Sequence, residues 1–182
     1  MLELEVLRDV VKKMNKINIE YMLTGSLAMN FYAEPRMTRD IDIVIDIYRE
    51  DVRKLVDIFQ KEYYISEKAV LESIKYNSSF NIIHNEKIMK IDFMIRKNNA
   101  YQIAAFNRKE IIELDDFQIY IVSKEDLVIA KLIWAYDSTS EKQKRDIENI
   151  LDTDHDKTYL RKWLIKLELL DFFREFINAR YI

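Results

Sequence analysis

The sequence predicts an α+β protein in which a mixed β-sheet flanked by helices is followed by a helical C-terminal region. Two observations support this prediction. Short runs with alternating apolar residues recur up to residue 122, and from residue 123 onward the apolar period becomes helical. We therefore expect a sheet-containing core over residues 1–122 and a helical region over residues 123–182 that packs on it.

Each expected element follows from its hydrophobic spacing and from the turn residues around it. In the core, helices are expected over residues 2–16, 27–32, 49–61, 66–74 and 101–107. Strands are expected over residues 21–24, 40–47, 80–83, 87–95, 110–114 and 117–122, with the last two joined as a hairpin around residues 115 and 116. The C-terminal helices are expected from residue 123 through 134, and over 141–151, 157–167 and 169–179.

The composition restricts the class of protein. The chain has 182 residues, no cysteine and a net charge of −3, so disulfides and thiol catalysis are excluded and no global attraction to nucleic acid is expected. No segment has the form of a signal peptide or the ~18 apolar residues of a membrane span. These features predict a cytoplasmic protein with no membrane partner.

The only glycine of the chain, Gly25, lies between an apolar strand and a short helical stretch. Glycine permits a positive φ and a close approach of the backbone, and Ser26 is placed to cap the helix that follows. A strand, a tight turn and a helix N-terminus together favour binding of an anion such as phosphate. The alternative is that Ser26 is an ordinary helix cap.

Three aspartates are candidates for metal binding. Asp40 and Asp42 alternate along one expected strand, which places them on one face with Cα atoms ~6.7 Å apart. Asp92 interrupts the otherwise apolar run of a later strand, where an unpaired charge is costly to bury. Carboxylates of this kind suit Mg²⁺ that also contacts substrate phosphates. The alternatives are a solvated strand face for the pair, and an open face or a lysine partner for Asp92.

The order Gly25-Ser26, Thr38-x-Asp40-x-Asp42 and a later lone aspartate resembles the nucleotidyltransferase superfamily of the DNA polymerase β type. The match covers residues 19–95, and a looser match over residues 123–151 resembles its minimal AbiEii-like branch. The resemblance implies a nucleotidyltransferase-like fold and transfer of a nucleoside monophosphate from an NTP to an acceptor, with release of pyrophosphate. Its implied cofactor is a pair of Mg²⁺ ions, with Mn²⁺ as the alternative.

The resemblance also implies roles for individual residues. The metal ligands would be Asp40, Asp42 and Asp92, and Asp92 would also assist deprotonation of the acceptor. Lys131 would neutralise phosphate charge and so belongs with the catalytic residues. The expected nucleotide-binding residues are Gly25, Ser26, Arg36, Arg39, Lys131 and Asp146. Each of these residues also has an alternative interpretation without a role in binding. Arg36 and Arg39 could be exposed charges of a loop, Lys131 could extend from the core to solvent, and Asp146 could form an ion pair on the helix surface.

Other classes of function stay open at this point. The chain could be a non-catalytic nucleotide-binding module, the toxin component of a toxin–antitoxin pair with a cognate antitoxin, or a helical interaction protein. The acceptor could be a tRNA, a protein or a small molecule, and the chain could form a homo-oligomer. Leu27 follows Ser26 where some family members carry an arginine, so an arginine contact to the triphosphate would have to come from Arg36 or Arg39.

Overall fold

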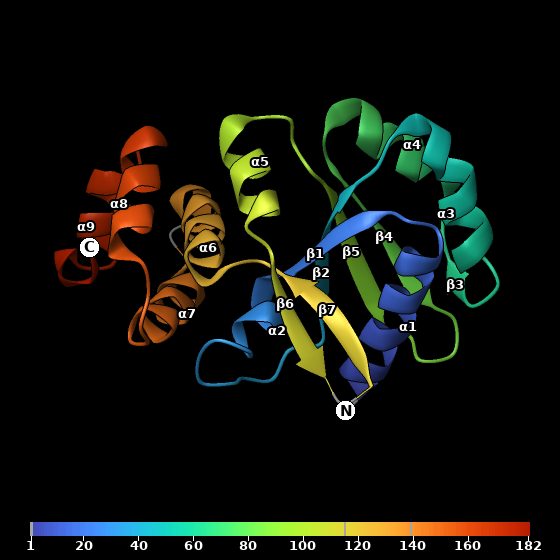
Figure 1. Cartoon of the computed structure of the whole chain (residues 1–182), viewed down its shortest axis with the longest axis horizontal. Coiled ribbons are helices and arrows are strands. Elements are labelled where there is room, and N and C mark those ends of the chain that lie inside the picture. The colour runs from blue at the N-terminus through green and yellow to red at the C-terminus, as the bar shows by residue number, and fades with distance from the viewer. Residues whose placement is uncertain (1, 115, 139) are drawn as a thin grey trace.

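A mixed β-sheet lies at the centre of the protein, and its strands run in the order β3-β4-β5-β2-β1-β7-β6 (Figure 1). The computed structural model describes residues 2–114, 116–138 and 140–182, and seven strands form the sheet within them. The strands are β1 (Glu20–Thr24), β2 (Ile41–Asp46), β3 (Tyr63–Tyr64), β4 (Ser79–His84), β5 (Lys90–Ile95), β6 (Glu110–Leu114) and β7 (Phe117–Ile121).

The register of the three central strands brings distant parts of the sequence together. β1 and β2 are antiparallel, and Thr24 is opposite Asp42. β2 and β5 are parallel, and Asp42 is opposite Asp92 although the two are fifty positions apart in the sequence. Residues directly opposite one another in adjacent strands point to the same face of the sheet. One end of the central strands therefore carries both carboxylates.

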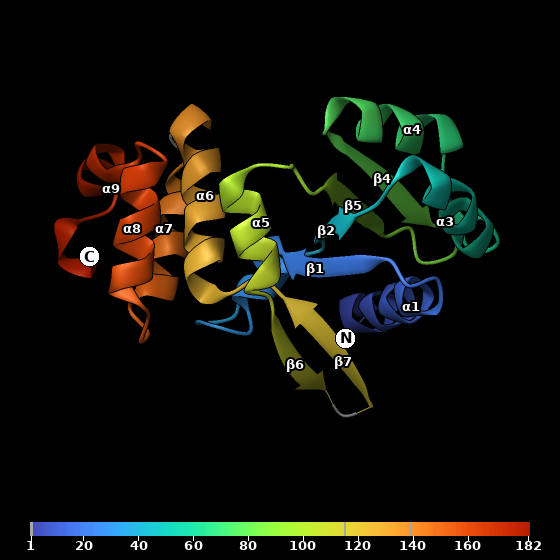
Figure 2. The same ribbon diagram turned by 45° about the horizontal axis from the view of Figure 1, so that its top comes forward.

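The helices pack around this sheet according to their apolar faces. α1 buries Val6, Val10 and Met14, which lie on one face at helical spacing. In Figure 2 the last four helices are grouped together beyond α5, away from α1, α3 and α4. The helices are α1 (Leu2–Lys16), α2 (Gly25–Met29), α3 (Val52–Phe59), α4 (Glu67–Tyr76), α5 (Ala100–Asn107), α6 (Lys124–Ser138), α7 (Glu141–Leu151), α8 (Lys157–Lys166) and α9 (Leu170–Phe176).

The structure confirms the predicted fold class, an α+β protein with a mixed sheet and C-terminal helices. The predicted order of helices and strands is also present, and Ser66 caps α4 as expected by accepting a hydrogen bond from Ala69 N. The division into a core of residues 1–122 and a region of residues 123–182 stays a prediction. The turn predicted at residues 115 and 116 falls partly outside the described residues.

Several predicted boundaries were wrong, each for a local reason. The helix after the glycine spans Gly25–Met29 rather than residues 27–32, because it begins at the glycine itself. Ser26 is therefore not its N-cap; Thr24 has that position and makes no side-chain cap bond. The strand predicted from residue 87 begins at Lys90, after Ile88 takes a positive φ of 51°.

The remaining differences concern short elements. A 3-10 turn, Arg49–Asp51, precedes α3, and another, Ala179–Tyr181, follows α9 where a longer helix was predicted. Strand β3 was not predicted, because two residues are too short for alternation to be seen. None of the described helices is long and apolar enough to cross a membrane.

Candidate active site

Gly25 stands at the point where β1 turns into α2, and the conformation there requires glycine. Its φ is +68°, in the region that L-residues with side chains rarely adopt. A Cβ added to Gly25 would lie 2.0 Å from Oδ2 of Asp42. The single glycine thus lets the turn lie directly against one of the predicted metal ligands.

The three predicted carboxylates line one cavity of about 500 Å³ together with Gly25 and Ser26. Asp42 and Asp92 are partly buried neighbours on β2 and β5. Asp40 is exposed and precedes β2, which begins at Ile41, so it reaches the cavity from the connecting segment rather than from the strand. All three aspartates therefore line the same cavity, while their roles as metal ligands stay predictions.

The carboxylate of Asp42 is in an electrostatically unfavourable position. Burial, with the charges of Asp92 and Asp40 nearby, raises the pKa of Asp42 to about 6. Among the described residues no hydrogen bond is made to its carboxylate oxygens. A carboxylate that is desolvated, crowded by like charges and without a donor is poised to accept a cation.

Asp92 already has a cationic neighbour. Nζ of Lys90 lies 2.6 Å from Oδ2 of Asp92, and the Lys90 side chain is about half exposed. This hydrogen bond raises the pKa of Lys90. The lysine partner considered from the sequence is thus present, with a side chain that stays in contact with solvent.

The donor set fits Mg²⁺ bound jointly with a substrate. No three acidic or histidine side chains within the described ranges form a cluster that could hold a metal ion by themselves. Mg²⁺ is commonly held by one or two carboxylates, with water and substrate phosphates completing its coordination. Asp42 and Asp92 are oxygen donors on adjacent strands in an open cavity, so they match that partial set.

A buried ionic network lies beside the glycine turn. Asp146 on α7 accepts two hydrogen bonds from Arg36, at 2.8 Å each, and one from Lys131 on α6, at 2.7 Å. Arg36 also donates to Oγ of Ser26 at 2.6 Å. Both Lys131 and Asp146 have side chains only 5% exposed. Asp146 is therefore in a buried ion pair with Lys131, and not in the helix-surface ion pair that was the alternative for it.

The charges of this network do not cancel. Burial acts to raise the pKa of Asp146, but the hydrogen bonds from Arg36 and Lys131 outweigh it and lower that pKa. Burial lowers the pKa of Lys131, and the bond to Asp146 opposes that effect. With both cations protonated, two positive charges share one negative charge. The surplus faces the cavity through Lys131, which lines it.

The other predicted nucleotide-binding residues lie at different places. Arg36 and Asp146 stand behind Ser26 and Lys131, and they hold these two residues rather than line the cavity. Arg39 is exposed and lines a separate groove, which it shares with Asp40 and Lys90. Direct contact of these three residues with a nucleotide stays a prediction.

Sequence reasoning missed several residues that line the cavity. Lys90 stands two positions before Asp92, and alternation along β5 could have placed both on one face. Trp134 is 62% exposed and follows Lys131 by three positions, a spacing that places them on one helix face. The other missed residues are Thr24, Met94, Leu127, Ala130, Lys142 and Gln143.

Comparison with known proteins bears on the fold. The chain matches no family model and no curated protein sequence. Among solved structures, it is similar to ANT(2″)-Ia in complex with adenylyl-2″-tobramycin, with a TM-score of 0.60, 13% identity, and coverage of 97% of this chain and 99% of that one.

Two further solved structures are similar. The nucleotidyltransferase-like antigenic protein from Paracoccidioides brasiliensis aligns with a TM-score of 0.57 and 15% identity, over 97% of this chain and 93% of that one. The lincosamide antibiotic adenylyltransferase LnuA, bound to lincomycin, aligns with a TM-score of 0.50 and 16% identity, over 79% and 93%. The chain therefore has the fold of these nucleotidyltransferase structures.

Proposed function

We propose that this protein is a Mg²⁺-dependent nucleotidyltransferase that moves a nucleoside monophosphate from an NTP to an acceptor and releases pyrophosphate. The observation that carries the proposal is the adjacency of Asp42 and Asp92 in one cavity with the Gly25–Ser26 turn. The fold, shared with adenylyltransferase structures, supports the same reaction class.

The side chains divide the work of the reaction. Asp42 and Asp92 hold the metal, and bound Mg²⁺ supplies charge neutralisation and alignment of the attacking and leaving oxygens. The Gly25 turn gives the phosphates a close approach to the backbone. Lys131 faces them with a buried positive charge, and preorganised charge in a desolvated site is worth more than in water.

Arg36 and Asp146 act as positioning residues in this proposal. Asp146 holds Lys131 and Arg36 together, and Arg36 fixes the hydroxyl of Ser26. The AbiEii-like interpretation rests on the sequence resemblance around Lys131 and Asp146. The toxin and antitoxin prediction rests on the resemblance alone.

The reaction balances without a redox partner. An acceptor hydroxyl oxygen forms a bond to the α-phosphorus of the NTP, and the bond from that phosphorus to the β-phosphate oxygen breaks. The products are the nucleotidylated acceptor and pyrophosphate. In this proposal Asp92 lies beside the acceptor hydroxyl and receives its proton, which passes on to solvent.

The test is incubation of the full chain with each α-labelled NTP, Mg²⁺, and cellular RNA, protein or small-molecule extract in turn. We expect label transfer with release of pyrophosphate, and no transfer by Asp42→Asn. The control is Asp57→Asn, which removes an exposed aspartate of α3 that does not line the cavity. Mg²⁺-dependent NTP binding without pyrophosphate release would indicate the non-catalytic module instead.

Metal binding gives a second readout that does not depend on turnover. Mn²⁺ can replace Mg²⁺ at oxygen sites and is detected by its paramagnetic resonance signal. We expect Asp42→Asn to weaken Mn²⁺ binding in the presence of a nucleotide, and Asp57→Asn to leave it unchanged. Equal binding by both variants would remove Asp42 from the metal site.

A further inference from the structure

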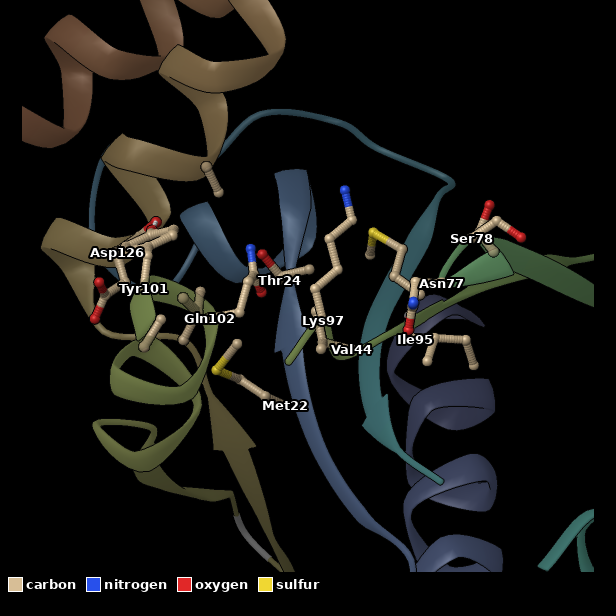
Figure 3. Close-up of a pocket in the computed structure, with 15 residues that line it drawn as sticks. Met22, Thr24, Val44, Asn77, Ser78, Ile95, Lys97, Tyr101, Gln102 and Asp126 are labelled. Atoms are coloured by element: carbon tan, nitrogen blue, oxygen red, sulfur yellow. Dashed lines mark hydrogen bonds between the residues drawn. The ribbon is translucent and has the colours of Figure 1, made fainter. Parts of the chain in front are cut away.

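A second chamber continues the active-site cavity on the same face of the sheet (Figure 3). Its volume is about 350 Å³, within the lower range of small-molecule sites. Thr24, Met94 and Ala130 line both chambers, so the two chambers are adjacent, and together they are called the cleft below. The wall also includes residues of the first turn of α5 and of the segment that connects α4 to β4, together with residues of the central strands and of α6.

The second chamber begins next to the two carboxylates. Val44 and Met94 are opposite one another on β2 and β5, two positions beyond Asp42 and Asp92 on the same face. Two positions along a strand correspond to ~6.7 Å. The Gly25 turn lines the first chamber and is not part of the lining of the second. The cleft thus extends to both sides of the carboxylate pair, as an in-line displacement requires for its attacking and leaving groups.

Among the residues that line the second chamber, no carboxylate is free to bind a positively charged ligand. Its lining contains one acidic residue, Asp126, which is completely buried. Ser123 and Tyr159 donate hydrogen bonds to the two oxygens of Asp126, at 2.7 and 2.9 Å. Arg108 lies 3.3 Å away and compensates its charge. Asp126 therefore offers no free carboxylate oxygen to a ligand.

Lys97 is the other charged residue of the lining, and it is exposed. Within the described ranges it makes no ion pair with a carboxylate. Figure 3 shows Lys97 between Tyr101 and Gln102 on one side and Asn77 on the other. An exposed ammonium without a carboxylate partner favours an anion and repels a cation.

We propose that the second chamber binds the acceptor, and that the acceptor is a small hydroxyl compound with one anionic group, such as a sugar phosphate or a sugar acid. The anionic group contacts Lys97, and the hydroxyl lies beside Asp92. This proposal rests on the proposed function for its chemistry. The acceptor hydroxyl oxygen bonds to the α-phosphorus, pyrophosphate leaves, and the hydroxyl proton is released.

The charge of the chamber can be tested without knowledge of the acceptor. The chain has no cysteine, so Gln102→Cys creates a unique thiol in the chamber. The probes are two methanethiosulfonates, one with a sulfonate and one with a trimethylammonium group. We expect the anionic reagent to react several-fold faster, and Lys97→Glu to reverse this order. Asn107→Cys, exposed at the other end of α5, should show a much smaller preference.

The transfer assay then compares glucose 6-phosphate, glucuronate, glucose, tobramycin and an RNA oligonucleotide as acceptors. We expect the two anionic sugars to be used best. Lys97→Glu should lower kcat/KM for them about tenfold, the effect of losing one charged contact, and leave KM for the NTP unchanged. Lys61→Glu, an exposed lysine outside the cleft, is the control.

Three results would overturn the proposal. These are faster reaction of the cationic reagent with Gln102→Cys, preferred transfer to tobramycin or RNA, and a rise in KM for the NTP with Lys97→Glu. The last would mean that the chamber holds the nucleotide. Failure of the proposed function is distinguishable, because then no NTP releases pyrophosphate with any acceptor, while the thiol reactions still report the charge of the chamber.

Discussion

Replacing Asp42 with asparagine should make the metal-free protein more stable while it removes activity. In the folded protein the pKa of Asp42 rises from 3.8 to about 6, first because of burial and then because of Asp92 and Asp40. One pKa unit corresponds to about 1.4 kcal/mol, so the charged form of Asp42 costs about 3 kcal/mol of folding free energy above pH 6. Asparagine has nearly the same shape and no charge, so it avoids this cost.

The sign of the pH dependence follows from proton binding. Because the folded-state pKa is above the unfolded one, the folded protein binds the proton more tightly between about pH 4 and pH 6. The contribution of Asp42 to the free energy of unfolding therefore falls as the pH rises through this window, and it stays low above it. The difference between wild type and Asp42→Asn should be small at pH 4 and largest at pH 8.

The assay is thermal unfolding of the two proteins at pH 4 and pH 8, with and without Mg²⁺. For a chain of this length 1 kcal/mol shifts Tm by roughly 2–4 °C, so we expect the metal-free variant at pH 8 to gain roughly 6–12 °C over wild type. Mg²⁺ with an NTP should raise the Tm of wild type and leave the variant unchanged. Asp57→Asn should show no such pattern.

One outcome would refute the reasoning. If Asp42→Asn lowered Tm by the same amount at pH 4 and pH 8, ionisation of Asp42 would not cost folding free energy. Asp42 would then be a structural residue whose polar contacts the asparagine disturbs, and the case for a cation at this position would lose its electrostatic support.

Three further predictions concern the same cavity. Gly25→Ala should lower both Tm and Mg²⁺-dependent NTP affinity, because its Cβ would meet Asp42 and its φ is positive; unchanged affinity in calorimetry would contradict this. Lys131→Ala should keep Mn²⁺ binding but lower the transfer rate by ~10²–10³, and Lys131→Arg should recover part of it; a wild-type rate would make Lys131 a core lysine. Trp134 is exposed at the cavity while Trp163 is buried, so NTP binding should quench the fluorescence of wild type but not of Trp134→Phe, and equal quenching would place the nucleotide elsewhere.

The sequence predicted those parts of the site that depend on local patterns. The unique glycine predicted the turn, alternation predicted the strand that carries Asp42, and an apolar run predicted the strand that carries Asp92. The pairing of those strands is a contact between segments fifty residues apart, and it followed from the family resemblance rather than from periodicity.

Tertiary contacts account for what the sequence did not predict. Arg36 lies in a segment without regular structure, so no pattern could predict that it bridges Ser26 on α2 and Asp146 on α7. The alternative of a helix-surface ion pair for Asp146 was wrong, because burial of a helix face depends on which element packs against it. Here that element is α6. The Ser26 cap was wrong because the helix starts two residues earlier than the pattern indicated.

The pairing of Asp42 with Asp92 across two hydrogen-bonded strands has a consequence for how this protein can diversify. The spacing of the two carboxylates depends on the backbone of the sheet, which side-chain substitutions hardly change. Several residues that line the second chamber, such as Lys97 and Gln102, lie outside these two strands, and they can be exchanged without disturbing that spacing. Selection for a new acceptor could therefore act on one half of the cleft while the other half keeps its chemistry.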